Sequence, residues 1–294
     1  MRIATSQLFD RPLSLMSRLT VQADAAQTSI ATGKKYTAPS ENAGAYLQLQ
    51  GLRRATAEGK AYAANVGLAG SLLKQTDSVL GHAETQLQRV QELTTQAATG
   101  TLTDANRLAI SKELDSIRDE LFAIANTKDM RGQPLFGGAS GDTAYAKAAD
   151  GTIAFAGAGE PSPIPIGDGD RVQATIPGGP VFGDMFAMIG NLSSALKAGG
   201  DVSPATDAAL TSVQARLETV GSARASAGAR AARLELDGDR LSELATDREA
   251  TRVTIEDTDI ASAVTELQKT LTVLQATQAS FTKLTALSLF DYLR

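Results

Sequence analysis

The chain contains no cysteine and no tryptophan, and His82 is its only histidine. The lack of cysteine excludes disulfides, thiolate metal sites and a cysteine nucleophile. With a single histidine, a zinc site would need three carboxylates around it, and the two-histidine helix of metalloproteases is excluded. Because His82 falls in a long helical repeat, where a lone histidine is usually a surface or seam residue, no Ser-His-Asp arrangement is predicted.

Aromatic residues make up only 4% of the 294 residues, although 43% are hydrophobic. Aromatic side chains bury the largest areas, so their scarcity favours thin helical packing over a thick enzyme core. The chain has 28 basic and 33 acidic residues and no long basic run, so nucleic acid is not an expected partner. There is no run of eighteen apolar residues and no secretory signal at the N-terminus. These residues alone predict a cytoplasmic protein without a membrane span, unless a dedicated export machine reads another signal.

The acidic segment from Glu256 to Asp259 and two glycine pairs remain as candidates for a ligand site. Calcium is the less favoured interpretation of the acidic segment, because acidic residues also suit the first turn of a helix, where Thr258 or Asp259 can cap. The glycine pairs at 137–138 and 178–179 follow no strand-then-helix phosphate pattern, so they indicate turns. The sequence therefore predicts no catalytic residue, no cofactor and no metal site.

Heptad spacing at both ends of the chain is the strongest positive signal. Near the C-terminus an unbroken 4-3 repeat runs through Ile260, Val264, Leu267, Leu271, Leu274, Gln278 and Phe281. Near the N-terminus the same spacing is followed less strictly by Leu8, Pro12, Leu15, Leu19, Gln22, Ala26 and Ile30. Such a repeat gives a helix a narrow apolar seam that suits a partner helix, either within the chain or on another molecule.

The interior holds further seams, which break at Thr99-Gly100-Thr101 and at Pro39 to Gly44. One runs from Tyr62 to Ala97 through Val66, Ala69, Leu73, Thr76, Leu80, Ala83, Leu87, Val90 and Thr94. Others run through Ile110, Leu114, Ile117, Leu121 and Ile124, and from Leu210 to Ala245 through Val213, Leu217, Val220, Arg224, Ala227, Ala231, Leu234, Gly238 and Leu241. A shorter helix is predicted from Phe182 to Leu196, after the glycine-rich turn at 177–180. Small residues at many seam positions predict long antiparallel rods.

Residues 131–180 break the helical pattern with clustered glycine and proline. The runs 152–155 and 171–176 are typical of strands between turns, and the alternating prolines 161, 163 and 165 suit an extended or edge segment. We therefore expect a mainly α protein. Residues 1–40 and 255–294 form paired terminal coiled-coil helices for assembly, residues 41–130 and 181–254 form a long antiparallel helical rod, and residues 131–180 form a small β-rich outer insertion.

Several motifs, in this order, resemble those of the bacterial flagellin and hook–filament junction family. They are Ile30-Ala31-Thr32-Gly33-Lys34-Lys35, Leu87 to Ala97 (LQRVQELTTQA), Ile124-Ala125-Asn126-Thr127, Gly132 to Gly138 (GQPLFGG), Ile255 to Ala261 (IEDTDIA) and Gln275 to Phe281 (QATQASF). The chain departs from the pattern at Glu41-Asn42, where relatives usually carry two aspartates after Pro-Ser. The resemblance covers nearly the whole chain except the strands of the insertion.

Two features are similar to the junction branch of this family. The chain ends in Leu287-Ser288-Leu289-Phe290-Asp291-Tyr292-Leu293, and the insertion carries Leu-Phe-Gly-Gly, Gly-Asp-Thr-Ala and Val-Phe segments. Flagellin, the filament subunit, is the alternative, since a short flagellin would share both rods. A cell-surface carbohydrate-binding homologue is a weaker alternative, because the insertion offers few aromatics beyond Tyr145 and Phe155 for sugar stacking. An enzyme is the least favoured class.

The resemblance implies a structural subunit of the flagellum that connects hook to filament. It implies export through the flagellar type III apparatus without a cleavable signal, and hence an extracellular location. The implied partners are like subunits, a neighbouring hook-associated protein, flagellin and an export chaperone. Arg89, Leu93 and Glu113 match positions that an animal innate receptor reads in flagellins, although rod packing explains them more simply.

The assembly interface is expected on the apolar positions of the two terminal segments. These are Leu8, Leu15, Leu19, Ile30, Ile260, Val264, Leu267, Leu271, Leu274, Phe281, Leu287, Leu289 and Phe290. Residues 1–40 carry five basic and two acidic side chains, whereas residues 255–294 carry three basic and five acidic ones, so their net charges are +3 and −2. Opposite charges favour pairing, but each exposed pair contributes only about 0.2–1 kcal/mol, so apolar burial must dominate.

Overall fold

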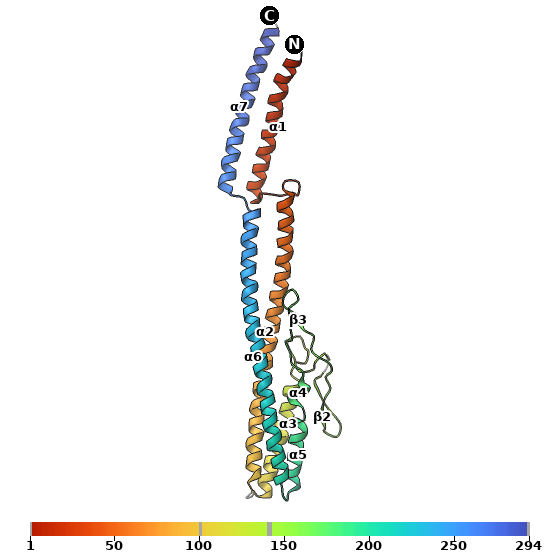
Figure 1. Ribbon diagram of the computed structural model, residues 1–294. Helices are drawn as coiled ribbons and strands as arrows, with labels where there is room; N and C mark the ends of the chain where they lie inside the picture. The colour runs from red at the N-terminus through yellow and green to blue at the C-terminus, as the bar shows by residue number, and fades with distance from the viewer. Residues whose placement is uncertain (1, 100–101, 140–142, 293–294) are drawn as a thin grey trace. The chain divides into compact units, whose positions relative to one another are not determined.

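A computed structural model describes residues 2–99, 102–139 and 143–292 of the chain, with the side chains of residues 10–99, 102–139 and 143–283. The fold is mainly α-helical with a small β-rich insertion, which confirms the expected fold class (Figure 1). The chain forms two compact units, a terminal unit of Met1–Glu58 with Leu244–Arg294 and a central unit of Gly59–Glu243. Both boundaries fall inside long helices, so the division expected at helix ends stays a prediction.

The helices and strands follow the expected order along the chain. The helices are α1 (Arg2–Thr32), α2 (Ala43–Ala98), α3 (Asp104–Ala125), α4 (Gly178–Phe182), α5 (Met185–Ala198), α6 (Ser203–Glu256) and α7 (Ile260–Tyr292). The strands are β1 (Tyr145–Lys147), β2 (Ile153–Phe155), β3 (Ile164–Pro165) and β4 (Arg171–Val172). They form two antiparallel pairs, β1 with β2 and β3 with β4.

The long seam of α2 is the part of the core that the sequence predicted most completely. Tyr62 is partly buried, and every later seam position from Val66 to Ala97 is buried, including the two threonines Thr76 and Thr94. Each threonine hydroxyl donates to the carbonyl four residues earlier in the helix, so neither polar group is left unsatisfied inside the core. The 4-3 repeat therefore marks the real buried face of α2.

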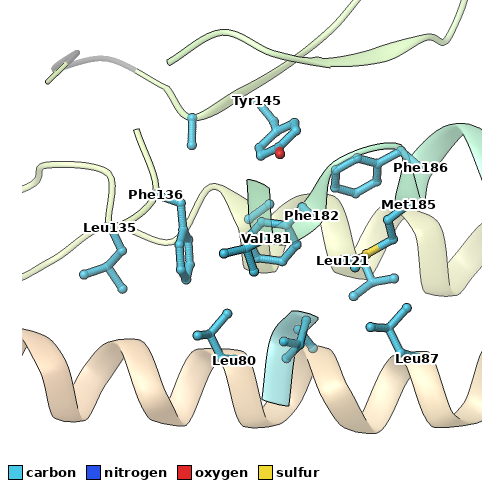
Figure 2. Packing of buried hydrophobic residues seen from close by; sticks show 14 of the residues in the cluster. Leu80, Leu87, Leu121, Leu135, Phe136, Tyr145, Val181, Phe182, Met185 and Phe186 are labelled. Atoms are coloured by element: carbon cyan, nitrogen blue, oxygen red, sulfur yellow. The ribbon is translucent and has the colours of Figure 1, made fainter. Parts of the chain in front are cut away.

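A cluster of aromatic side chains joins the insertion to the helices in the central unit (Figure 2). The ring of Phe182 lies 5.0 Å from that of Phe136, 5.8 Å from that of Tyr145 and 6.5 Å from that of Phe186. The Tyr145 hydroxyl donates to the carbonyl of Gly178 at 2.9 Å, so its polar end is satisfied although the residue is buried. Aromatic packing therefore anchors the insertion on the helices of the central unit.

The insertion differs from the sequence prediction in two details. The strand expected over 171–176 stops after two residues, and the helix expected from Phe182 is two helices, α4 and α5, separated at Gly183. The helix is divided at Gly183, whose φ of +43° ends α4. The glycine-rich segment before it packs closely, since a Cβ on Gly178 would lie 2.9 Å from the Cβ of Phe136. Glycine lets this segment coil directly over the aromatic cluster, where the sequence pattern suggested only a turn.

Candidate assembly interface

The terminal helices α1 and α7 pack antiparallel along their length within the terminal unit (Figure 1). Their shared core is thin. Among their described side chains only Leu19, Ala23 and Thr270 are buried. Two of these three residues are small or polar, so the pair buries little apolar area for its length, and packing rather than propensity supplies most helix stability. The pair is therefore stabilised weakly by its own contacts.

The structure divides the expected interface residues into two groups. Leu19 is buried, and Ile30, Leu267, Leu274 and Phe281 are partly buried. By contrast, four residues remain exposed to between 37% and 53%, namely Leu15, Ile260, Val264 and Leu271. The side chains of Leu8, Leu287, Leu289 and Phe290 lie outside the described residues.

The buried face of α7 is not the whole heptad seam that the sequence predicted as one surface. Thr270 is buried, although the repeat omits it, whereas Leu271 in the repeat is 41% exposed. Neighbouring positions of a straight helix point about 100° apart, so the face towards α1 and the apolar face of the repeat coincide only in part. The large apolar residues that are exposed among the described side chains of the two helices are Leu13, Leu15, Val21, Ile260, Val264, Leu271 and Val273. We call this set the exposed stripe.

A charged cluster joins the chain segments at the inner end of the terminal pair. The side chain of Glu256, only 4% exposed, accepts from Lys34 at 2.7 Å, from Arg53 at 3.0 Å and from Arg252 at 2.8 Å. Three cations thus surround one carboxylate, and hydrogen bonds from Lys34 and Arg252 lower the pKa of Glu256 to about 2. The cluster links the segment after α1 to α2 and to the end of α6.

Backbone hydrogen bonds beside this cluster join the segment that follows α1 to the segment between α6 and α7. The amide of Lys35 donates to the carbonyl of Glu256 at 2.7 Å, and the amide of Thr258 donates to the carbonyl of Gly33 at 2.9 Å. Gly33 has a φ of +69°, which glycine adopts without strain. Two short backbone hydrogen bonds and one glycine therefore define the path of the chain where α1 and α6 end.

The interpretation of residues 256–259 as the first turn of a helix was only partly correct. Asp259 does cap α7, because its carboxylate accepts from the amides of Ala261 at 3.0 Å and Ser262 at 3.3 Å. Glu256, however, is the last residue of α6, where it binds cations from other segments. A local pattern could not reveal those partners, since Lys34 and Arg53 lie about two hundred residues away.

Acid should weaken the joint at Glu256 in a definite pH range. A carboxyl whose pKa falls from 4.5 to about 2 on folding stabilises the folded state by about 3 kcal/mol above pH 4.5, and this contribution is lost as the pH falls towards 2. We expect Glu256→Gln to speed hydrogen exchange of residues 33–36 and 253–259 at neutral pH. The difference from the unsubstituted protein should disappear near pH 2.

Glu249→Gln is the matched control for this prediction, because Glu249 also binds Arg252 but its side chain is 62% exposed. It should change the exchange rates little at any pH, since exposed pairs contribute at most about 1 kcal/mol. Equal effects of the two substitutions would show that Glu256 is not the centre of the joint.

The three residues that resemble receptor-recognised positions lie together on the central unit. Arg89 pairs with Glu113 at 2.7 Å and with Glu92 at 2.9 Å. Leu93 is 2% exposed and belongs to the core. Packing and ion pairing thus give each residue a role in the rod, and receptor recognition stays a prediction.

The described residues offer little for the alternative functions. Tyr145 is buried, so of the two aromatics considered for sugar stacking only Phe155 is exposed, at 37%. His82 is exposed on α2. The described part of the chain contains no group of three or more histidine, aspartate or glutamate side chains placed to hold a metal ion. Within the same part, no helix combines the length and apolarity needed to cross a bilayer.

Comparison with known families matches both helical regions of the chain. Residues 13–140 match the bacterial flagellin N-terminal helical region, and residues 210–293 match the bacterial flagellin C-terminal helical region. The two matches leave out most of the insertion and the short helices that follow it.

Individual relatives of the chain are also flagellar proteins. Flagellar hook-associated protein 3 of Salmonella typhimurium is 31% identical over 138 residues, which cover 47% of this chain and 44% of that protein. The protein of the same name from Escherichia coli is 28% identical over 144 residues, covering 49% of this chain and 45% of that protein. In both cases the matched segment spans less than half the length of the relative.

A solved structure shares the fold over a larger part of the chain. The crystal structure of flagellar hook associated protein-3 from Legionella pneumophila superposes with a TM-score of 0.65, covering 70% of this chain and 98% of that one. The two sequences are 14% identical, so this likeness shows the fold.

Proposed function

The chain belongs to the bacterial flagellin family, a family of flagellar structural proteins, and we propose that it is the hook–filament junction subunit, a hook-associated protein 3. The observation that carries an assembly role is the exposed stripe, which leaves apolar side chains of α1 and α7 in water. The names of the Salmonella and Escherichia relatives, together with the residues of the Leu287 to Leu293 segment, favour the junction over the filament.

In this role residues 1–40 and 255–294 are the assembly helices, and residues 131–180 form the outer surface. The partners are like subunits, a neighbouring hook-associated protein on one side and flagellin on the other. The subunit travels through the flagellar export apparatus with a chaperone and functions outside the cell, without enzymatic activity. A thinly packed terminal pair supports this proposal, because it can unfold for export and gain its missing burial when neighbours cover the exposed stripe.

Immunogold labelling of intact flagella tests the proposal. Antibodies against the insertion, residues 131–180, should label one point between hook and filament. A strain that lacks the gene should assemble hooks without filaments, and the gene supplied in trans should restore them. Gold particles along the whole filament would contradict the junction role and support flagellin instead. Filaments of normal number in the deletion strain would contradict both.

A further inference from the structure

A charged layer around Arg224 interrupts the apolar contact between α2 and α6 in the central unit. Arg224 occupies a seam position of α6, where its Nε donates to Asp77 at 2.9 Å and its Nη1 donates to Glu84 at 2.7 Å. The two carboxylates are seven residues apart, so they lie two turns apart on the same face of α2. These hydrogen bonds, that to Asp77 first, raise the pKa of the Arg224 guanidinium.

The guanidinium of Arg224 packs against Gly81, which lies between the two carboxylates on α2. A Cβ at Gly81 would lie 3.5 Å from the Arg224 Cζ and 3.6 Å from its Nη2. The planar group therefore lies close to the α2 backbone, where a side chain longer than alanine would displace it.

The apolar seam by itself does not define how α2 and α6 align. Leu73, Leu80 and Leu87 repeat every seven residues on α2, and α6 repeats in the same way at Val213, Val220, Ala227, Leu234 and Leu241. If α6 slipped along α2 by one heptad, about 10 Å, apolar positions would again face apolar positions. A unique alignment of the two helices must therefore come from residues that find their partners in one alignment only.

Arg224 is such a position, because only the observed alignment gives it two carboxylates. A slip of one heptad in one direction would place it beside Gly70, Lys74 and Asp77, where the lysine repels it. The opposite slip would place it beside Glu84, Gln88 and Gln91, with one carboxylate only. We propose that Arg224, Asp77 and Glu84 form a register key that selects a single alignment of α2 against α6.

The same geometry predicts that the key contributes more to alignment than to stability. The side chains of Arg224, Asp77 and Glu84 are 36%, 43% and 28% exposed, and partly exposed ion pairs give little net stabilisation. Polar groups within an apolar helix interface can nevertheless fix its register. The register key is a property of the folded subunit and does not depend on the proposed function.

Spin labels on the full chain test this inference directly. Because the chain has no cysteine, Thr95→Cys and Ala232→Cys place one label on an exposed position of each helix. Double electron–electron resonance should give one narrow distance in this background. Replacing the key by Arg224→Leu with Asp77→Asn and Glu84→Gln should add a second population, displaced by about 10 Å, while the melting temperature stays within a few degrees.

Two further variants keep the test decisive. Asp77→Asn with Glu84→Gln alone retains Arg224, which is exposed enough to stay solvated, and should also give two distances. Arg233→Leu with Asp237→Asn removes weaker ion pairs, with atoms 3.5 to 3.8 Å apart, that join these two residues to each other, to Arg240 and to Asp170. None of them joins α6 to α2, so this control should leave one distance. A single unchanged distance in either variant of the key would overturn the inference, as would a second distance in the Arg233 control.

Discussion

Replacing Phe182 by alanine is expected to lower the free energy of unfolding of the central unit by about 3–5 kcal/mol. The side chain is fully buried, and its ring contacts those of Phe136, Tyr145 and Phe186 (Figure 2). The described structure gives this unit no other aromatic cluster, so the cavity left by the ring would open at the point where the insertion meets the helices.

Urea unfolding of the full chain, followed by circular dichroism in the aromatic region, measures this effect. Phe155→Ala is the matched control, because Phe155 also contacts Tyr145, with ring centroids 5.3 Å apart, but is 37% exposed. We expect the control to cost only about 1–2 kcal/mol, since over a third of Phe155 already faces water. If the two substitutions cost the same, Phe182 is not the anchor of the insertion.

The sequence predicted the rods well because their seams have partners inside the same chain. From Val66 to Ala97 each heptad position of α2 is covered by other helices of the central unit, so periodicity and burial coincide. The same coincidence holds on α3, where Ile110, Leu114, Ile117 and Leu121 are all buried. Where one element is enclosed on its apolar face, the pattern alone locates the core.

In the terminal helices, the heptad pattern and the observed burial no longer agree. A heptad seam indicates that a helix packs against an apolar partner, but it does not indicate how many helices cover the seam. On α7, Leu267 and Leu274 turn towards α1, whereas Val264 and Leu271 stay exposed. The sequence could not divide the seam in this way, because the division depends on the small residues that α1 presents, such as Ala23.

Polar contacts between distant segments were missed for a similar reason. Asn126 follows α3 and accepts from the amides of Ala144 at 3.1 Å and Tyr145 at 2.9 Å, which fixes the first strand of the insertion. In the sequence, Asn126 stood out only as part of the Ile124 to Thr127 motif. Hydrophobic periodicity cannot reveal a polar side chain that binds a distant loop. The cations around Glu256 are a second case.

Charges placed on the exposed stripe should abolish assembly while the free subunit still folds. Val264 and Leu271 are 37% and 41% exposed and seven residues apart, so they lie on one side of α7. Val264→Asp with Leu271→Asp leaves Leu267, Leu274 and the contact with α1 in place, so we expect circular dichroism and the melting temperature of the free subunit to change little. Burying two carboxylates without partners at a subunit contact would cost several kcal/mol.

Thr265→Asp with Thr272→Asp is the matched control, because it adds the same charge at the same spacing on another face of α7, where both side chains are exposed. The decisive measurement is complementation of a deletion strain, with filaments counted by electron microscopy and motility measured in soft agar. The exposed stripe predicts that the Val264 and Leu271 variant is exported but gives bare hooks, whereas the control restores filaments. Normal filaments with the Val264 and Leu271 variant would show that the exposed stripe is not the assembly surface.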